Sequence, residues 1–306
     1  MTGAEDSPSQ DRSVGRLQPR LHCTLEGHQG AVYDLVVSDE GDLLSVGGDG
    51  LLVRWSRVEG AWNPRGLAVA RAAAPLFAVC CTPDGAVLAG TGDGGVLSLG
   101  RDGAWSVKPA HPGGTYVVTP MTTGGADGKW LVWPNGTCLA EVPGRLRCHV
   151  KTEKGEWLGT SEGRLHPLHG GSAVQAHEGA VRAVMAWPGK EALASAGSDG
   201  RIQIWKQDRG GLSPVLSMDA HKGSIYRMAP SPDGRWVATC SRDKSLAVWD
   251  AEGLDLVVRI ARPHWPAHTR SVNAMCWLSP DMLATAGDDG RILIWDLVGG
   301  EAPAGV

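Results

Sequence analysis

A tight acidic turn followed by a short alternating strand recurs seven times along this chain, and this repeat constrains the fold more than any other feature. Its clearest copies are AGSDGRIQIW at 196–205 and AGDDGRILIW at 286–295. Successive copies lie 34 to 46 residues apart, with turn acids at Asp49, Asp93, Asp127, Glu162, Asp199, Asp243 and Asp289. Repeats of about 40–45 residues that consist of short strands are typical of propeller blades.

Each repeat divides into four strand-like segments, most clearly in the fifth copy. Residues 180–186 form an apolar run typical of an inner strand, and 192–196 form a second strand. The turn Ser198-Asp199-Gly200 follows, where glycine supplies the positive φ of a tight hairpin. Residues 201–205 and 214–218 complete the set. No segment shows the 3.6-residue apolar period of a helix over three turns, so we predict almost no helix.

Composition excludes several classes of protein. An apolar content of 42% excludes a wholly disordered chain, and no stretch of 18 apolar residues is present to span a membrane. The polar start MTGAEDSPSQ predicts no secretory signal. The net charge of −4 argues against nucleic-acid binding. Seven cysteines without a CxxC motif predict free thiols and a cytoplasmic protein.

Several dipeptides and histidines make the chain resemble the WD-repeat β-propeller family. Gly27-His28 begins the first repeat, and later repeats begin near His177, His221 and His268. Trp-Asp pairs close the last two repeats at 249–250 and 295–296. The resemblance covers about residues 20–297, strongly in repeats one, five, six and seven, and with eroded motifs in two, three and four. It implies an all-β, seven-bladed propeller of four-stranded antiparallel blades.

Strand counting predicts how such a ring closes. The seventh repeat ends at Asp296 after its third strand, and the following LVGGEAPAGV is too rich in Gly and Pro to form another. We therefore expect Arg20–Leu25 to supply the outer strand of the last blade, which would hide an open sheet edge. The predicted organisation is a disordered tail at 1–17, a propeller at 18–297 and a flexible tail at 298–306.

The resemblance also implies a structural hydrogen-bond chain of His, Ser or Thr, Asp and Trp in each well-formed repeat. In this sequence the four chains are His28, Ser45, Asp49 and Trp55; His177, Ser195, Asp199 and Trp205; His221, Thr239, Asp243 and Trp249; and His268, Thr285, Asp289 and Trp295. The third repeat keeps Thr123, Asp127 and Trp133, with His111 unusually close. Because these sets recur at fixed spacing, we interpret them as structural, not catalytic.

Enzyme-like motifs fit poorly with this organisation. GTGDGG at 90–95 matches a dinucleotide fingerprint, but a strand follows it where that fingerprint needs a helix. GTSEG at 159–163 matches a nucleophile elbow around Ser161, again without a following helix. His166 and His169 lie nearby, but residues three apart on a strand face opposite ways, which disfavours metal ligation. We therefore expect no catalytic residue, no metal and no cofactor.

The candidate binding surface is the channel rim, because the family presents inner-strand residues there. The aligned rim residues are Tyr33, Phe77, Arg147, Arg182, Tyr226 and Asn273, with the third repeat ambiguous. Arg242 and Asp288 precede turn acids and are expected beside them. Trp265 is expected as an additional exposed anchor, and Trp62, in a loop expected on the opposite face, is a weaker candidate. Aromatic and arginine side chains are enriched at interface hot spots.

Together these features predict a non-catalytic scaffold or adaptor that binds a protein or peptide on the channel-rim face. We expect a monomeric propeller within a larger complex, with neither nucleic acid nor membrane as partner. The alternative is an enzyme or a small-ligand sensor with a single site at the propeller mouth. Its enzymatic version would use the mouth or the group Ser161, His166 and His169.

Overall fold

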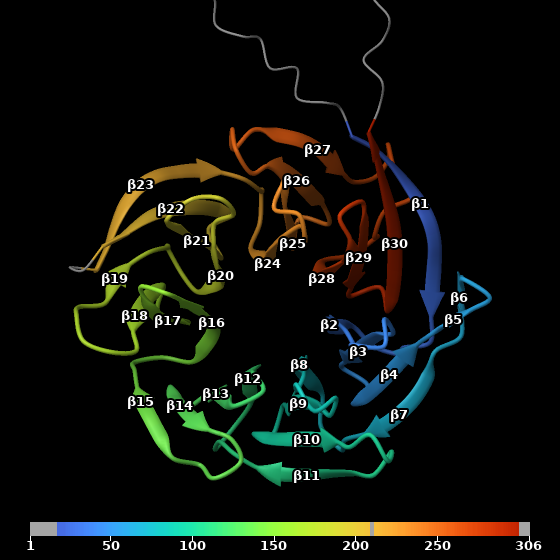
Figure 1. The fold of residues 1–306 in the computed structure, drawn as a ribbon, viewed down its shortest axis with the longest axis horizontal. Coiled ribbons are helices and arrows are strands. Elements are labelled where there is room, and N and C mark those ends of the chain that lie inside the picture. The colour runs from blue at the N-terminus through green and yellow to red at the C-terminus, as the bar shows by residue number, and fades with distance from the viewer. Residues whose placement is uncertain (1–16, 209–210, 300–306) are drawn as a thin grey trace, which may run out of the picture.

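The computed structural model describes residues 17–208 and 211–299, which form seven four-stranded antiparallel sheets around a central channel (Figure 1). A two-stranded hairpin, β5 (Arg57–Val58) and β6 (Ala61–Trp62), is inserted in the first blade. The described residues contain strands and turns without helix, and thus no helical segment that could cross a bilayer. The predicted all-β propeller with seven blades is confirmed.

The strands follow the chain from the channel outward in each blade. Blade one contains β2 (Val32–Val37), β3 (Leu43–Gly47), β4 (Leu51–Trp55) and β7 (Leu67–Arg71). Blade two contains β8 (Leu76–Cys81), β9 (Val87–Thr91), β10 (Gly95–Leu99) and β11 (Trp105–Pro109). Blade three contains β12 (Thr115–Val118), β13 (Thr122–Gly125), β14 (Lys129–Val132) and β15 (Cys138–Glu141). Blade four contains β16 (Leu146–Thr152), β17 (Gly155–Thr160), β18 (Arg164–Pro167) and β19 (Val174–Gln175).

The remaining blades are built in the same way, except for the last. Blade five contains β20 (Val181–Ala186), β21 (Ala192–Gly197), β22 (Arg201–Asp208) and β23 (Gly211–Asp219). Blade six contains β24 (Ile225–Pro230), β25 (Trp236–Ser241), β26 (Leu246–Asp250) and β27 (Leu256–Ile260). Blade seven combines β28 (Val272–Ser279), β29 (Met282–Gly287) and β30 (Arg291–Gly299) with β1 (Leu17–Glu26) from the other end of the chain.

The core lies between neighbouring blades. The second strand of a blade is buried on both faces, as in β3, where all five residues are buried. One core cluster joins Ile202 and Ile204 of blade five to Val237 and Trp249 of blade six. Each sheet therefore buries both faces against its neighbours, which explains why most second strands consist largely of apolar and small residues.

The ends of the described chain close the ring. Strand β1 pairs antiparallel with β30 from Leu17 opposite Gly299 to Glu26 opposite Arg291, as Figure 1 shows at the edge of the last blade. The closure predicted for Arg20–Leu25 is confirmed. Within the described residues no separate strand follows Asp296, but the third strand does not end there as expected. β30 continues to Gly299, where the start of β1 pairs with it and Leu297 is buried.

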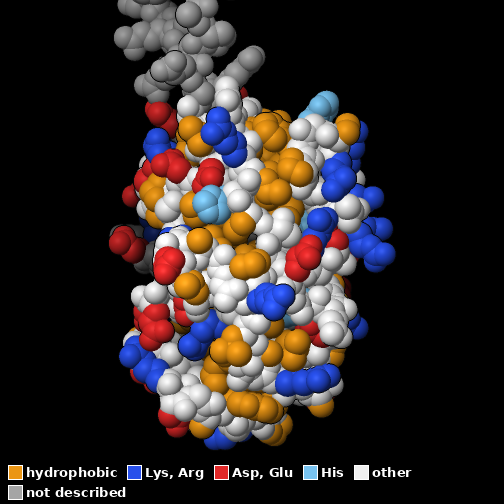
Figure 2. Space-filling model, turned by 90° about the vertical axis from the view of Figure 1, so that its right-hand side faces the viewer, with side chains coloured by type: hydrophobic (Ala, Val, Ile, Leu, Met, Phe, Trp, Pro, Cys, Tyr) orange, Lys and Arg blue, Asp and Glu red, His pale blue; other side chains and the backbone are white. Residues whose placement is uncertain are grey.

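The predicted tails fall mostly outside the described residues. Residues 1–16 and 300–306 are not described, whereas Leu17, Val298 and Gly299 belong to the paired strands β1 and β30. The side of the ring over β1 and β5–β7 carries interspersed acidic, basic and apolar side chains (Figure 2). That side view thus shows no extended field of one charge.

Candidate functional site

Candidate functional residues lie in two places: in the hydrogen-bond chains inside the blades and at the rim of the channel. In blade one, Asp49 accepts a hydrogen bond from His28 Nδ1 at 3.0 Å. His28 Nε2 lies 2.7 Å from Ser45 Oγ, and Trp55 Nε1 donates to the same Oγ at 2.8 Å. The same bonds link the predicted sets His177–Asp199–Ser195–Trp205, His221–Asp243–Thr239–Trp249 and His268–Asp289–Thr285–Trp295.

The bonds in these sets fit a neutral imidazole. The indole N–H donates to the hydroxyl oxygen, the hydroxyl can donate its own proton to Nε2, and an Nδ1–H can donate to the carboxylate. Burial lowers the pKa of His28, His177 and His221, which agrees with this neutral form. Every member has a partner, so the sets stabilise their blades, and their recurrence in four blades fits a structural role.

Blade three carries a shorter version of the chain. His111 Nδ1 lies 2.9 Å from Asp127, and His111 Nε2 lies 3.0 Å from Thr123. The expected indole is missing from this chain, because β14 ends at Val132 and Trp133 lies beyond it. Trp133 is half-buried against the cluster around Ala78 and Leu88 instead. The prediction that Trp133 serves as the third-strand tryptophan of this repeat is wrong.

Ser161, at the centre of the enzyme-like group, makes a structural contact with the backbone just before β16. Ser161 Oγ accepts the backbone N–H of Arg145 at 2.9 Å. His166 is buried within β18, and burial lowers its pKa, whereas His169 is exposed. Over residues 17–208 and 211–299, no three His, Cys, Asp or Glu side chains are grouped to hold a metal ion.

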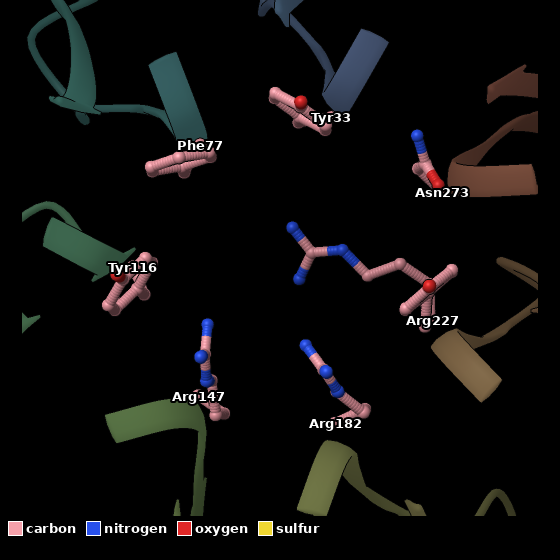
Figure 3. Close-up of a pocket in the computed structure, with 8 residues that line it drawn as sticks. Tyr33, Phe77, Tyr116, Arg147, Arg182, Arg227 and Asn273 are labelled. Atoms are coloured by element: carbon pink, nitrogen blue, oxygen red, sulfur yellow. The ribbon is translucent and has the colours of Figure 1, made fainter. Parts of the chain in front are cut away.

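The channel mouth gathers one side chain from every blade. A pocket of about 380 Å³ opens there, and we call it the mouth pocket; its lining residues are Tyr33, Phe77, Tyr116, Arg147, Arg182, Tyr226, Arg227 and Asn273 (Figure 3). All six aligned rim residues from the sequence analysis line it. Tyr116 and Arg227 were missed. Tyr116 fills the place left ambiguous for the short third repeat.

A single backbone feature aims these side chains at the channel. Each rim residue is the second residue of its inner strand, and the pairing with the second strand skips it in all seven blades. In blade three, for example, Thr115 pairs with Gly125 and Val117 with Gly124, which leaves Tyr116 in a β-bulge. A bulge re-aims the side chain of its extra residue. In blade one the rim residue Tyr33 directly follows the buried Val32, and in blade three Tyr116 directly follows the buried Thr115. This shared position in the inner strand could have located Tyr116 from the sequence.

Aromatic rings occupy one arc of the mouth pocket, and arginines occupy most of the other. The Tyr33 and Phe77 ring centroids are 5.3 Å apart, and those of Phe77 and Tyr116 are 5.4 Å apart. The guanidinium carbon of Arg147 lies 4.3 Å from the Tyr116 ring centroid. That of Arg182 lies 5.5 Å from the Tyr226 ring. Stacking on tyrosine stabilises each guanidinium and holds its plane.

An ion pair crosses the channel at the floor of the mouth pocket. Arg227 Nη2 from blade six lies 2.5 Å from Asp34 Oδ1 of blade one. Asp34 also accepts the backbone N–H groups of Leu35 at 2.9 Å and Val79 at 3.0 Å. Figure 3 shows the Arg227 side chain extended into the channel. Asp34 therefore connects blades one, two and six.

The other predicted rim residues lie outside the mouth pocket. Arg242 is exposed, and Asp288 accepts a hydrogen bond from Asn273 Nδ2 at 2.7 Å. Trp265 is not the exposed anchor we expected, because it is half-buried against the core of the last blade. Trp62 is only 7% exposed, since it packs into the core on β6 while Arg57 covers its ring at 4.6 Å. That burial removes Trp62 as a surface candidate.

Comparisons with known proteins agree with this architecture. The family WD domain, G-beta repeat matches four segments, residues 19–56, 171–206, 212–250 and 261–296. The chain carries WD repeats in these four places. The unmatched stretch between 56 and 171 contains the eroded repeats, which the turn spacing predicted and the structure confirms as blades two to four.

Individual relatives of this WD-repeat protein are distant. The ribosome biogenesis protein WDR12 homolog of Chlamydomonas reinhardtii is 30% identical over 61% of this chain and 43% of its own length. Protein HIR1 of Candida albicans is 27% identical over 34% of this chain and 16% of its own. The chain thus spans less than half the length of these curated relatives. The WD40 β-propeller domain of Doa1 superposes with a TM-score of 0.76 and 18% identity, over 92% of this chain and 97% of that one.

Proposed function

We propose that this WD-repeat propeller is a non-catalytic interaction platform that binds a segment of another protein at the mouth pocket. The observation that carries the proposal is the set of seven bulges, which turns one side chain per blade toward a shared cavity. The side chains gathered there are mostly Tyr, Phe and Arg, and Tyr and Arg are enriched at interface hot spots. Relatives named for ribosome biogenesis and a shared repeat family support a role in protein complexes.

The proposal includes a monomeric propeller working within a larger assembly in the reducing cytoplasm. All seven cysteines are free, and burial raises the pKa of Cys80 and Cys148 to about 12, which keeps those two as unreactive thiols. Free structural thiols are typical of a reducing compartment.

The experiment compares partner capture by full-length wild-type protein with capture by two matched variants. Tyr33→Ala with Phe77→Ala removes two of the three rings of the aromatic arc, which are Tyr33, Phe77 and Tyr116. Trp105→Ala removes an exposed aromatic of similar size on outer strand β11, away from the channel. In quantitative affinity purification, we expect the double variant to lose at least tenfold of its specific partner and Trp105→Ala to retain it. Equal capture by all three proteins would refute binding at the mouth.

A further inference from the structure

The mouth pocket holds more positive charge than its own carboxylates neutralise. Arg147, Arg182 and Arg227 come from the neighbouring strands β16, β20 and β24 and all line the cavity. Arg227 is paired with Asp34 at 2.5 Å. In residues 17–208 and 211–299, no carboxylate pairs with Arg147 or Arg182, and nearby Asp288 is bonded to Asn273. The cavity therefore presents two uncompensated cations.

Most hydrogen-bond donors of these two guanidiniums remain available. Each guanidinium lies over a tyrosine ring, Arg147 over Tyr116 and Arg182 over Tyr226. Arg182 Nε donates to Ser198 Oγ at 3.3 Å, and among the described residues no hydrogen bond involves its two terminal nitrogens. Figure 3 shows both side chains extending from the same edge toward the centre of the cavity. The Nε of Arg147 is buried and has no hydrogen-bond partner among the described residues.

Electrostatic repulsion between the two arginines also favours the binding of an anion between them. Burial, followed by the charge of Arg182, lowers the pKa of Arg147. A protein that holds two like charges together in a half-buried cavity stabilises a ligand of opposite charge there. Two cations match a phosphate monoester, which carries about −1.5 to −2 charges at pH 7 and offers three acceptor oxygens. A single carboxylate would leave one guanidinium uncompensated.

We propose that Arg147 and Arg182 form an anion subsite for the phosphate of a phosphorylated side chain on the partner segment. The rest of that segment lies against the facing arc of Tyr33, Phe77 and Tyr116, which offers apolar ring surface. The cavity of about 380 Å³ accommodates one such side chain. This inference rests on the proposed function, because the phosphate is carried by the partner that the mouth pocket binds.

A polyanionic nucleic acid fits this surface less well. The chain as a whole carries a net charge of −4, and the uncompensated charge is confined to a pocket on the scale of one side chain. Nucleic-acid binding requires a basic patch that follows many phosphates. The site thus matches one isolated phosphate group.

The test measures binding of blocked single amino acids to the full-length protein by titration calorimetry and phosphorus NMR. The probes are N-acetyl phosphotyrosine amide and N-acetyl phosphoserine amide, with N-acetyl tyrosine amide, N-acetyl aspartate amide and inorganic phosphate as comparisons. We expect at least one phosphorylated amide to bind tenfold or more tightly than every comparison. An aspartate amide that binds equally well, or inorganic phosphate that binds as tightly, would overturn a phosphorylated side chain as the ligand.

Three variants separate the subsite from general surface charge. Arg147→Gln with Arg182→Gln should abolish phosphorylated-probe binding, and Arg182→Gln alone should weaken it about tenfold. Arg71→Gln removes an exposed arginine on outer strand β7 that does not line the mouth pocket, so its affinity should equal that of wild type. The single variant Arg182→Gln, with its folding checked by circular dichroism, keeps the test decisive if the double variant is unstable. Unchanged binding in Arg182→Gln, or equal loss in Arg71→Gln, would contradict the subsite.

Partner capture distinguishes failure of this inference from failure of the proposed function. Suppose that the partner binds at the mouth, and that its capture is unchanged both by phosphatase treatment of the partner and by Arg182→Gln in the propeller. The anion subsite is then refuted, whereas the proposed interaction platform is not. If the phosphorylated probes bind while Tyr33→Ala with Phe77→Ala captures partners normally, the platform at the mouth is refuted.

Discussion

At the scale of single residues, stability and recognition depend on different positions of the same repeat. The bonded sets such as His221, Asp243, Thr239 and Trp249 lie inside the blades and satisfy one another. The bulged second residue of each inner strand, such as Tyr226, is free to vary because it pairs with no residue of the neighbouring strand. Because the two roles fall on different positions, the rim residue can differ from blade to blade without disturbing the hydrogen bonds that stabilise the blade.

The hydroxyl at the centre of a bonded set should account for much of what that set contributes to the free energy of unfolding. Thr239→Val leaves both Trp249 Nε1 and His221 Nε2 without a partner, whereas Thr123→Val in blade three leaves only His111 Nε2. An unsatisfied buried group costs about 1–3 kcal/mol. In urea unfolding, we expect Thr239→Val to lower the free energy of unfolding by more than Thr123→Val does, and the difference should be about that amount. Equal losses in the two blades would contradict the bonding scheme.

The same sets predict a dependence of stability on pH. Burial lowers the folded-state pKa of His28, His177 and His221, while an unfolded imidazole titrates at about 6.5. As pH falls below about 6.5, the unfolded state therefore binds protons that the folded state does not. Stability present above that pH is lost, by at most about 1.4 kcal/mol per pH unit for each site.

Carboxylates should extend this loss to lower pH. Burial alone would raise the pKa of Asp243 and Asp289, but hydrogen bonds from His221 and His268 outweigh it and hold both pKa values below the ordinary range. A second decline is expected below about pH 4, where these groups protonate in the unfolded state. Urea midpoints between pH 7.5 and 3.5 measure both steps. His221→Gln should make the first step smaller, since His28 and His177 still contribute to it. A constant midpoint of the wild type from pH 7.5 to 5 would contradict the first step.

At the scale of elements, the outer strand of the last blade is the most consequential segment. Strand β1 covers the edge of β30, and its Leu17 and Leu25 are buried. Sequence reasoning located this strand because the seventh repeat lacks a fourth segment of its own. It placed the end of β30 too early, since a Gly-rich stretch becomes a strand when a partner strand is already present to pair with it.

Truncation tests the closure directly. Deleting residues 1–26 removes β1, exposes the β30 edge and loses about 1.5–3 kcal/mol for each buried leucine. Deleting residues 1–15 leaves β1 whole. We expect thermal denaturation to show a melting temperature lower by about 10 °C or more for the first deletion only. A synthetic peptide of residues 17–26 should restore part of the loss, and equal melting temperatures would refute the closure.

The eroded blades show where element prediction fails. Blade three has four-residue strands throughout, and β19 of blade four has only two residues. Their turns and third strands were recognisable, but the expected role of Trp133 was wrong because β14 ends at Val132. A fixed spacing predicts a contact only when the strand continues to the residue that makes it.

At the scale of the whole molecule, the channel is bridged by a contact that no repeat pattern contains. Arg227 reaches from β24 to Asp34 on β2, where the N–H of Val79 also donates. The bridge ties blade six to blades one and two. The ion pair with Asp34 also neutralises the charge of Arg227. Arg147 and Arg182 therefore remain as the uncompensated cations of the mouth pocket.

The bridge should be asymmetric under substitution. Arg227→Met leaves Asp34 nearly buried with only two backbone donors, and we expect a loss of about 1–3 kcal/mol, reduced because Arg227 is 38% exposed. Asp34→Asn leaves an arginine that can turn toward water, so its loss should be smaller. Urea unfolding of both single variants and the double variant measures the coupling energy. A greater loss for Asp34→Asn, or no coupling, would contradict the bridge.

The sequence by itself determined the seven blades, the ring closure, four bonded sets and six of the eight residues that line the mouth pocket. The blades follow from local periodicity and repeat spacing, and the closure follows from strand counting. The bonded sets and the rim residues follow from the resemblance to the WD-repeat family. Only the tertiary structure decided that Tyr116 completes the rim, that Trp62 is buried and that Arg227 pairs across the channel. Those outcomes depend on distances between blades, which are set when the ring closes and which no single repeat encodes.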